Sequence, residues 1–311
     1  MFPSNRSKNR LKNICSKKLV NDQEACEEIE LLYLHGVGLM EVKTIDFVIT
    51  TNYSPYFKSV PLLKRTIESL NLIQDLKNSF IKYRIIIAID GLDPIFNSLR
   101  KNYKKFIEDI YKLKIERVVI SNCELGEGWG HLSGNLCHAF DNFVKSEYVL
   151  IMQEDLPFIR DIPLLTIMDH MSIDARLKYI RFNRRKNEIY GFDSELAPYV
   201  IQGVNYLKVN NWTDNNHLMK TEDYRRYILP NIRGKKTFPE NELAPLNLKN
   251  PEIFGTFLYG KYNEPNVILH IGHLKHRIRV KMEFFKTTNS SFRYLIWLAI
   301  IGKDMINKFL D

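Results

Sequence analysis

The sequence is poor in the residues that mark zinc ribbons, redox motifs and disulfide-stabilised proteins. Only four of its 311 residues are cysteines, and no two of them have C-x-x-C spacing. A zinc ribbon or thioredoxin-type motif is therefore not indicated, and a reducing compartment is favoured. Long apolar runs are missing too, because residues 294–301 are too few for a bilayer, which takes about 20. Without a secretory signal at its amino end, the chain is expected to be cytoplasmic.

The two common phosphate-binding fingerprints are also absent. Residues 126–130 form a glycine-rich loop, but it lacks the lysine of a P-loop and the G-x-G-x-x-G of a dinucleotide fold. This weakens the case for an NTPase or a dinucleotide oxidoreductase. A simpler explanation of the glycines is a tight entry to the helix that follows. Asn135, near the start of that helix, could face a sugar or a phosphate.

Positive charge is what the composition offers instead. The formal net charge is +9, which suits an anionic partner such as a nucleotide, a nucleic acid or an anionic lipid surface. Part of that charge lies at the amino end, where residues 1–43 are predicted to form a basic tail with one short helix. A hydrophobic content of 45% and an aromatic content of 12% are ample for a packed core.

The apolar pattern predicts an α/β fold with a mixed, mostly parallel central sheet flanked by helices. Strand patterns alternate with helical periods through the first half, and further short strands follow in a less regular second half. The expected strands are 44–51, 83–89, 117–121, 148–153, 177–182, 200–209 and 267–269. Between 210 and 265, many Asn, Pro and Gly residues predict long loops.

Three parts of the chain follow from this pattern. We expect a tail over 1–43, one domain over 44–285 with halves 44–160 and 161–285, and a helix over 286–311. That last helix is expected to pack on the core, with peripheral membrane contact as the alternative.

Polar residues follow the predicted parallel strands at the points where they end. Thr50 and Asn52 end the first strand, Asp90 ends the second, and Glu154 and Asp155 end the fourth. Parallel strands place these ends along one edge, where α/β proteins bind ligands, so a nucleotide-type site is predicted there. Each residue also has a plainer explanation as a turn or loop residue.

The acidic pair after residues 148–153 is the most informative of these ends. A strand buried on both faces cannot hold carboxylates in its middle, but its carboxyl end opens onto the ligand crevice. Carboxylates there can bind a hard divalent cation, which in turn binds phosphate. The alternative is that Asp155 only caps the turn before Pro157.

At these residues the chain resembles the GT-A glycosyltransferases, the Rossmann-like fold that includes glycosyltransferase family two. The resemblance implies that Thr50, Asn52 and Asp90 hold the base, and that the acidic segment 153–155 binds ribose and a divalent metal. That segment is most similar to the Glu-Asp-Asp-Leu form of the N-acetylglucosaminyltransferase I type. It departs in Gln153 and Glu154, which leaves Asp155 as the metal ligand and Glu154 as a ribose or supporting residue. It further implies Mn²⁺ or Mg²⁺, a nucleotide-sugar donor, expected to be a UDP-sugar, and a loop-rich acceptor half.

The same resemblance implies a later catalytic base and a histidine that completes the metal site. The candidates for the base are Glu240, with Glu242 and Asp214 as alternatives, and the histidine is His270. A carboxylate is suited to take the proton of an acceptor hydroxyl. Each of these residues is alternatively a solvated or turn residue. Trp212, beside Asp214, is the aromatic residue expected to contact an acceptor sugar.

The leading hypothesis is a metal-dependent hexosyl- or pentosyltransferase that extends a glycan or glycosylated acceptor, inverting by direct displacement. A non-catalytic nucleotide- or sugar-binding relative and a sugar nucleotidyltransferase are the alternatives. A nucleic-acid-binding protein would explain the charge, but the basic residues are scattered and no known motif appears, so no nucleic-acid partner is expected.

Overall fold

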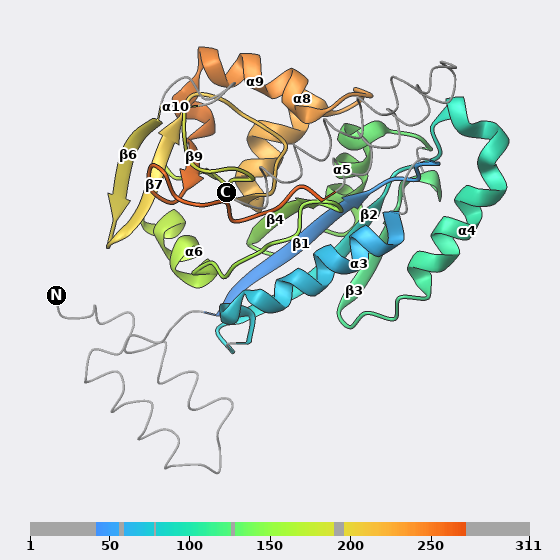
Figure 1. The fold of residues 1–311 in the computed structure, drawn as a ribbon. Coiled ribbons are helices and arrows are strands. Elements are labelled where there is room, and N and C mark those ends of the chain that lie inside the picture. The colour runs from blue at the N-terminus through green and yellow to red at the C-terminus, as the bar shows by residue number, and fades with distance from the viewer. Residues whose placement is uncertain (1–41, 56–58, 78, 126–127, 190–195, 272–311) are drawn as a thin grey trace, which may run out of the picture. The chain divides into compact units, whose positions relative to one another are not determined.

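The computed structural model describes residues 42–55, 59–77, 79–125, 128–189 and 196–271 (Figure 1). The chain divides after Val42 into two compact units, and the second begins at Lys43. The tail predicted for 1–43 lies outside the described residues except for Val42 and Lys43. The helix predicted for 286–311 also lies outside them. The division into halves at residue 160 stays a prediction, because one sheet runs through both.

The first half of the chain forms four parallel strands in the order β3-β2-β1-β4. Each strand is formed by a β-branched or apolar run of residues. In β1, Phe47, Val48 and Ile49 are fully buried, as expected of a strand covered on both faces. The strands are β1 (Lys43–Thr51), β2 (Ile81–Ile89), β3 (Val118–Asn122) and β4 (Tyr148–Gln153). All four agree with the sequence prediction to within two residues.

The second half extends the sheet with shorter, mixed strands. β8 lies antiparallel between β4 and β5, and the described residues form one nine-stranded sheet ordered β3-β2-β1-β4-β8-β5-β9-β7-β6. These strands are β5 (Tyr179–Arg181), β6 (Leu196–Ile201), β7 (Val204–Val209), β8 (His217–Lys220) and β9 (Thr256–Tyr259). A mixed sheet flanked by helices confirms the α/β class.

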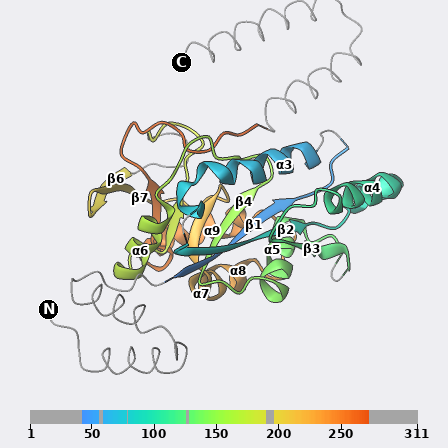
Figure 2. The same ribbon diagram turned by 90° about the horizontal axis from the view of Figure 1, so that it is seen from below.

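Helices cover both faces of this sheet, with α3 on one side and α5, α7 and α8 on the other (Figure 2). The two largest hydrophobic clusters of the described residues contain Leu63 of α3 and Phe140 of α5, respectively. The α-helices are α3 (Ser59–Ser69), α4 (Arg100–Tyr111), α5 (His131–Asn142), α6 (Leu164–Ile173), α7 (Thr221–Asp223), α8 (Leu229–Ile232), α9 (Pro239–Lys249) and α10 (Pro251–Phe254). Short 3₁₀ segments are η1 (Leu70–Leu72), η2 (Gln74–Lys77), η3 (Pro94–Leu99) and η4 (Cys123–Leu125), and η5 (Tyr224–Ile228) is a π-helix.

Three predictions for the second half were wrong. Residues 200–209 are not one strand but parts of the β6–β7 hairpin, whose turn residues Gln202 and Gly203 both have positive φ. Residues 267–269 make only a single bridge, from Ile268 to Phe158. The region 210–265 is not mainly loop, because β8, four α-helices and β9 lie in it. Proline at the first position of α9 and α10 starts a helix rather than preventing one.

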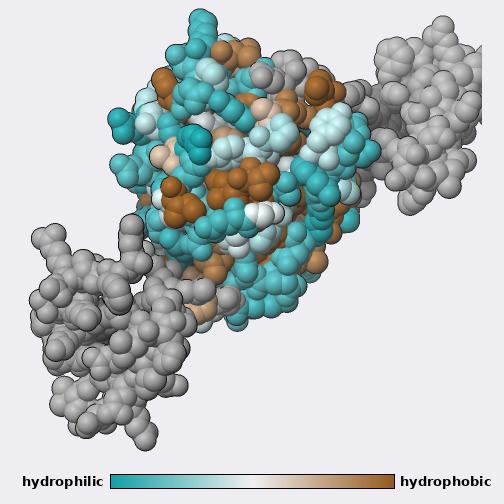
Figure 3. All heavy atoms as spheres, turned by 90° about the vertical axis from the view of Figure 1, so that its left-hand side faces the viewer, coloured by the Kyte–Doolittle hydropathy of each residue, from teal (hydrophilic) through white to brown (hydrophobic). Residues whose placement is uncertain are grey.

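The face on the side of β6, β7 and α6 has a mixed surface. Figure 3 shows hydrophobic spheres gathered in a band among hydrophilic ones on this face. Val200 of β6 and Ile173 at the end of α6 are exposed apolar residues of these elements. This face is not the one that carries the polar strand ends.

Candidate functional site

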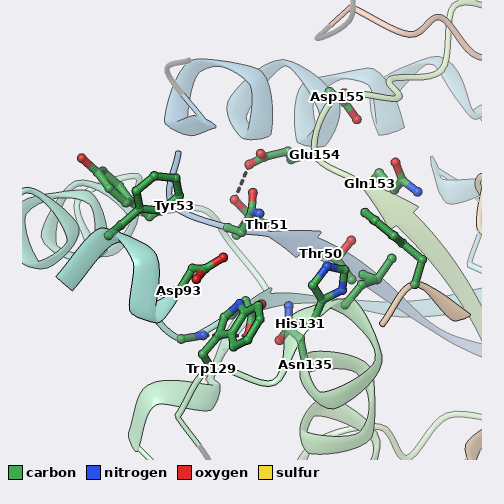
Figure 4. A pocket seen from close by; sticks show the side chains of 16 residues that line it. Thr50, Thr51, Tyr53, Asp93, Trp129, His131, Asn135, Gln153, Glu154 and Asp155 are labelled. Atoms are coloured by element: carbon green, nitrogen blue, oxygen red, sulfur yellow. Dashed lines mark hydrogen bonds between the residues drawn. The ribbon is translucent and has the colours of Figure 1, made fainter. Parts of the chain in front are cut away.

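The polar ends of β1, β2 and β4 meet around one cavity of about 360 Å³. Figure 4 shows Glu154 and Asp155 on one side of it and Trp129, His131 and Asn135 on the other. Six residues predicted from the sequence line this cavity. They are Thr50, Asn52, Asp90, Asn135, Glu154 and Asp155. The rule that parallel strand ends converge is therefore confirmed for this sheet.

Asp90 is buried and supports the glycine-rich loop. Its Oδ1 accepts the backbone N–H of Gly91 at 2.8 Å and that of Gly130 at 3.0 Å. Burial raises the pKa of Asp90 to about 6, although both N–H bonds favour the ionised form. A Cβ on Gly91 would lie 2.3 Å from the Gly128 carbonyl carbon, so this close approach requires glycine. The loop thereby seats α5 against the end of β2.

Thr50 and Glu154 join the ends of β1 and β4. The Thr50 hydroxyl donates to the Met152 carbonyl at 3.1 Å, and the Thr51 hydroxyl donates to the Glu154 carboxyl group. Glu154 is 6% exposed, and burial raises its pKa to about 8. A carboxyl group that is largely protonated near neutral pH is a poor ligand for a cation, so Glu154 is suited to a supporting position. Asn52 is exposed at the rim.

Asp155 and His270, the two predicted metal ligands, are in direct contact. His270 Nε2 lies 2.8 Å from Asp155 Oδ2, and both side chains are about one quarter exposed, at 25% and 22%. A carboxylate oxygen and an imidazole nitrogen both suit Mn²⁺, and an oxygen also suits Mg²⁺. Within the described residues, no group of three or more His, Cys, Asp or Glu side chains could hold a metal. A cation held here would need further ligands from phosphate oxygens or water.

Asp214 and Glu240 form a carboxylate pair beside the end of β4. The Asp214 N–H donates to Glu240 Oε2 at 3.4 Å, and Gln153 Nε2 donates to the Asp214 carbonyl at 3.0 Å. Burial, with a smaller contribution from the adjacent Glu240 carboxylate, raises the pKa of Asp214 to about 7. A carboxyl group that titrates near neutral pH beside a second carboxyl group can take part in accepting a proton from a substrate.

Glu242 lies apart from this pair. Residues two positions apart on a helix do not face the same way, and Glu242 instead forms an ion pair with Lys235. Neither Glu242 nor the pair lines the cavity, but Phe238, two residues before Glu240, does.

Asn135 and His131 present unpartnered polar atoms at the start of α5. Asn135 Nδ2 donates to the Ala88 carbonyl at 2.9 Å, while its Oδ1 and His131 Nδ1 are buried without a partner in the described residues. His131 has a φ of +57°, a conformation that is uncommon for a residue with a side chain. A ligand hydroxyl could satisfy Asn135 Oδ1.

The sequence did not reveal which aromatic residues line the cavity. The prediction that Trp212 contacts an acceptor sugar was wrong. Trp212 is fully buried and packs on Tyr179, with ring centroids 5.5 Å apart. Residue type does not reveal burial, and this tryptophan belongs to the core. The cavity instead contains Tyr53, Phe96, Trp129 and Phe238. Large apolar residues set among glycines or lysines, such as Trp129 and Phe238, were the available signal.

No protein-family model and no curated protein sequence matches the chain. Among the described residues, none of the helices has the length and apolar character needed to cross a bilayer.

Several solved structures are similar to the chain at low sequence identity. A TarS fragment of S. aureus has a TM-score of 0.42 and 11% identity, over 80% of this chain and 66% of that one. Glucosyl-3-phosphoglycerate synthase of Mycobacterium tuberculosis, solved with Mn²⁺, UDP and glucosyl-3-phosphoglycerate, has a TM-score of 0.41 and 13% identity. The match covers 78% of this chain and 80% of the synthase. CMP:2-keto-3-deoxy-manno-octonic acid synthetase, solved with CTP, has a TM-score of 0.39 and 14% identity. The match covers 77% of this chain and 98% of the synthetase.

A synthase solved with UDP and a synthetase solved with CTP thus both appear among these similar structures. At TM-scores near 0.4, such likenesses do not establish an activity or a residue's role in this chain.

Proposed function

We propose that the chain is a GT-A type glycosyltransferase that transfers a sugar from a UDP-sugar to a glycan or glycosylated acceptor. One observation carries the proposal: Asp90, the Asp155–His270 pair and the Asp214–Glu240 pair gather at the same edge of the sheet, on or beside one cavity. Each group suits a different part of such a reaction. A cavity of about 360 Å³ is of the size that small-molecule sites have.

The donor is assigned to the cavity by its chemistry. Asp90 would accept a base N–H, with Tyr53, Phe96 and Trp129 as apolar walls, and Asn135 Oδ1 would accept a donor hydroxyl. Asp155 and His270 would hold Mn²⁺ or Mg²⁺ against the diphosphate. A divalent cation bound there supplies positive charge for the leaving group.

Glu240 is assigned as the base, with Asp214 as its paired acid. The acceptor oxygen forms a bond to the anomeric carbon while the bond from that carbon to the diphosphate oxygen breaks. The nucleoside diphosphate leaves with the bonding electrons, and the acceptor proton passes to Glu240. A single displacement of this kind inverts the anomeric configuration and needs no covalent enzyme intermediate.

Thermal unfolding with and without nucleotides tests this proposal. We expect UDP-sugars with Mn²⁺ to raise the Tm of the chain, and CDP and GDP to raise it less, because a ligand that binds the folded state stabilises it. Asp155→Asn should remove the Mn²⁺-dependent part. The matched control is Asp169→Asn, which removes an exposed carboxylate and its 3.6 Å ion pair with Lys43. No Tm change with any nucleotide contradicts the proposal.

A non-catalytic nucleotide-binding protein is the second candidate, favoured by the acidic segment. Gln153 carries no charge and Glu154 is buried with a raised pKa, so Asp155 is the one carboxylate of 153–155 suited to a cation. That function predicts stabilisation by a UDP-sugar without release of UDP or transfer of sugar. Measuring UDP release under the same conditions separates the two candidates.

A further inference from the structure

Phe238 is a large apolar side chain that the fold leaves half exposed at the cavity. Its exposed fraction is 50%, and its ring meets the His131 ring edge-on, with centroids 4.5 Å apart and planes at 89°. A half-exposed phenylalanine forgoes much of the stabilisation that full burial would give. Single exposed apolar residues are common, so exposure alone identifies no site. What distinguishes Phe238 is how firmly its loop is held.

The loop before Phe238, residues 233–237, is fastened at four successive points. Arg233 pairs with Asp141 at 2.7 Å, and Lys235 pairs with Glu242. The Lys236 ammonium lies 5.3 Å from the centre of the Trp129 ring. The Thr237 carbonyl accepts both the backbone N–H of Ser133, at 3.2 Å, and its hydroxyl, at 2.7 Å.

Phe238 is held from the other side as well. It is the N-cap residue of α9, and Pro239, the first residue of that helix, is buried and has a fixed φ. The exposed ring is therefore a fixed part of the surface, and its position does not result from a loose loop.

The proposed base lies just after the fixed ring in the chain, in the first turn of α9. Glu240 follows Phe238 by two residues, and its Oε2 is the atom 3.4 Å from the Asp214 N–H. The ring also belongs to the wall of the cavity assigned to the donor. Gln153 lines the same cavity and donates to the Asp214 carbonyl at 3.0 Å, so a ligand on this ring would be close to both the donor cavity and the carboxylate pair. Trp212, the other aromatic candidate for this task, is buried.

We propose that Phe238 is the platform of the acceptor subsite, on which the apolar face of an acceptor sugar ring stacks. A pyranose has C–H groups on its faces and hydroxyls at its rim. Stacking on Phe238 therefore turns rim hydroxyls toward Glu240. The acceptor is accordingly a carbohydrate ring, and a peptide hydroxyl, which offers no such face, is not the substrate. This inference rests on the proposed glycosyltransferase function.

The test compares acceptor and donor kinetics in ring-changing variants. The wild-type chain is given the UDP-sugar that stabilises it most, Mn²⁺, and a panel of methyl glycopyranosides and short Ser/Thr peptides. We expect transfer to a glycoside, and Phe238→Ala should raise the acceptor KM about tenfold, the loss of one ring contact. The donor KM should change much less, and Phe238→Tyr should restore the acceptor KM because it keeps the ring.

Leu248→Ala is the matched control, since Leu248 is 60% exposed on the same helix. Transfer to peptides only, donor hydrolysis without transfer to any glycoside, or an equal rise of donor and acceptor KM in Phe238→Ala overturns the inference. These failures differ from failure of the proposed function, in which the wild-type chain either responds to no nucleotide or is stabilised by a UDP-sugar without releasing UDP.

Discussion

The carboxamide of Asn216 fastens the acidic segment after β4 to the loop that carries Asp214. Its Oδ1 accepts the Gln153 N–H at 3.1 Å, and its Nδ2 donates to the Leu156 carbonyl at 2.7 Å. The Gln153 side chain also donates a hydrogen bond to the Asp214 carbonyl. Because Asn216 is fully buried, these bonds do not compete with water. The carboxylates of the two loops are therefore held at a fixed spacing.

Asn216→Ala is expected to lower both stability and activity. It leaves a buried N–H at Gln153 and a buried carbonyl at Leu156 without partners, which costs about 2–4 kcal/mol of unfolding free energy. Urea denaturation measures this loss, and kcat measured where the variant is fully folded reports the displaced loop. Asn215→Ala is the control, since the Asn215 side chain is half-buried and donates to the Thr213 hydroxyl of the same loop, at 3.0 Å. Equal losses in the two variants contradict the role given to Asn216.

The parallel half of the sheet could be predicted because its strands are buried on both faces. Such strands appear in the sequence as continuous apolar runs, as in β1 and β4. The second half could not be predicted as well. β5 and β8 have three and four residues, and the place of β8 between β4 and β5 depends on contacts distant in sequence. Local sequence patterns do not predict which distant strands pair.

The candidate site was partly predictable for a similar reason. The position of Asp90 and Asp155 follows from where their strands end. The environment of Glu154 does not, since its burial depends on α3, where the Thr66 hydroxyl donates to the Glu154 carbonyl at 2.6 Å. Likewise, the contact between Asp214 and Glu240 requires the first turn of α9 to meet the loop before β8.

Asp90→Asn is expected to weaken UDP-sugar binding and remove its pH dependence between pH 5 and 7. The pKa of Asp90 is raised to about 6 by burial, so its carboxylate forms within this range and becomes the better acceptor for a base N–H. The amide oxygen of the variant could still accept from Gly91 and Gly130, which preserves the turn. Calorimetric titration at pH 5, 6, 7 and 8 measures the affinity.

A UDP-sugar is the right ligand for that titration, because its diphosphate does not ionise in this range. Asp93→Asn, in the same cavity wall, is the control: it should keep the pH dependence and move it to slightly lower pH, because the Asp93 carboxylate contributes to the raised pKa of Asp90. Wild-type affinity that is constant from pH 5 to 7 contradicts a role for Asp90 in reading the base.

Glu154→Gln is expected to make the protein more stable than the wild type above about pH 8. The pKa of Glu154 is raised from 4.5 to about 8 by burial, so the folded state holds its proton more tightly than the unfolded state does. Its contribution to stability is complete below the unfolded pKa and is lost as pH rises through the folded one, by about 1.4 kcal/mol per pH unit at the steepest. Glutamine does not ionise, so the variant does not lose this stability as the pH rises.

Melting curves of the wild type and Glu154→Gln from pH 5 to 9 test this expectation. The difference between the two curves isolates Glu154, because the raised pKa values of Asp90 and Asp214 act in the same direction in both proteins. Glu108→Gln, an exposed change on α4, should leave the curve of the wild type unaltered. Curves for the wild type and Glu154→Gln that run parallel up to pH 9 would mean that the Glu154 carboxyl group is not the group that titrates.

The Asp214–Glu240 pair predicts a rate that rises with pH through about 7. Below this value the pair holds a proton, because the pKa of Asp214 is raised to about 7 by burial and by the adjacent Glu240 carboxylate. Above it, Asp214 is ionised and the pair accepts a proton from the acceptor more readily. Glu240→Gln should lower kcat/KM by about 100-fold or more. Asp214→Asn should retain most activity and lose the rise near pH 7.

Profiles of kcat/KM from pH 5.5 to 9 for both variants decide which carboxyl group is the base. If Asp214 is the base, Asp214→Asn is the inactive variant. Glu240→Gln then stays active, and its rise moves to lower pH, because removal of the neighbouring carboxylate lowers the pKa of Asp214. Glu242→Gln tests the remaining alternative. Since its side chain is paired with Lys235, we expect a change of less than about twofold, as for other exposed ion pairs.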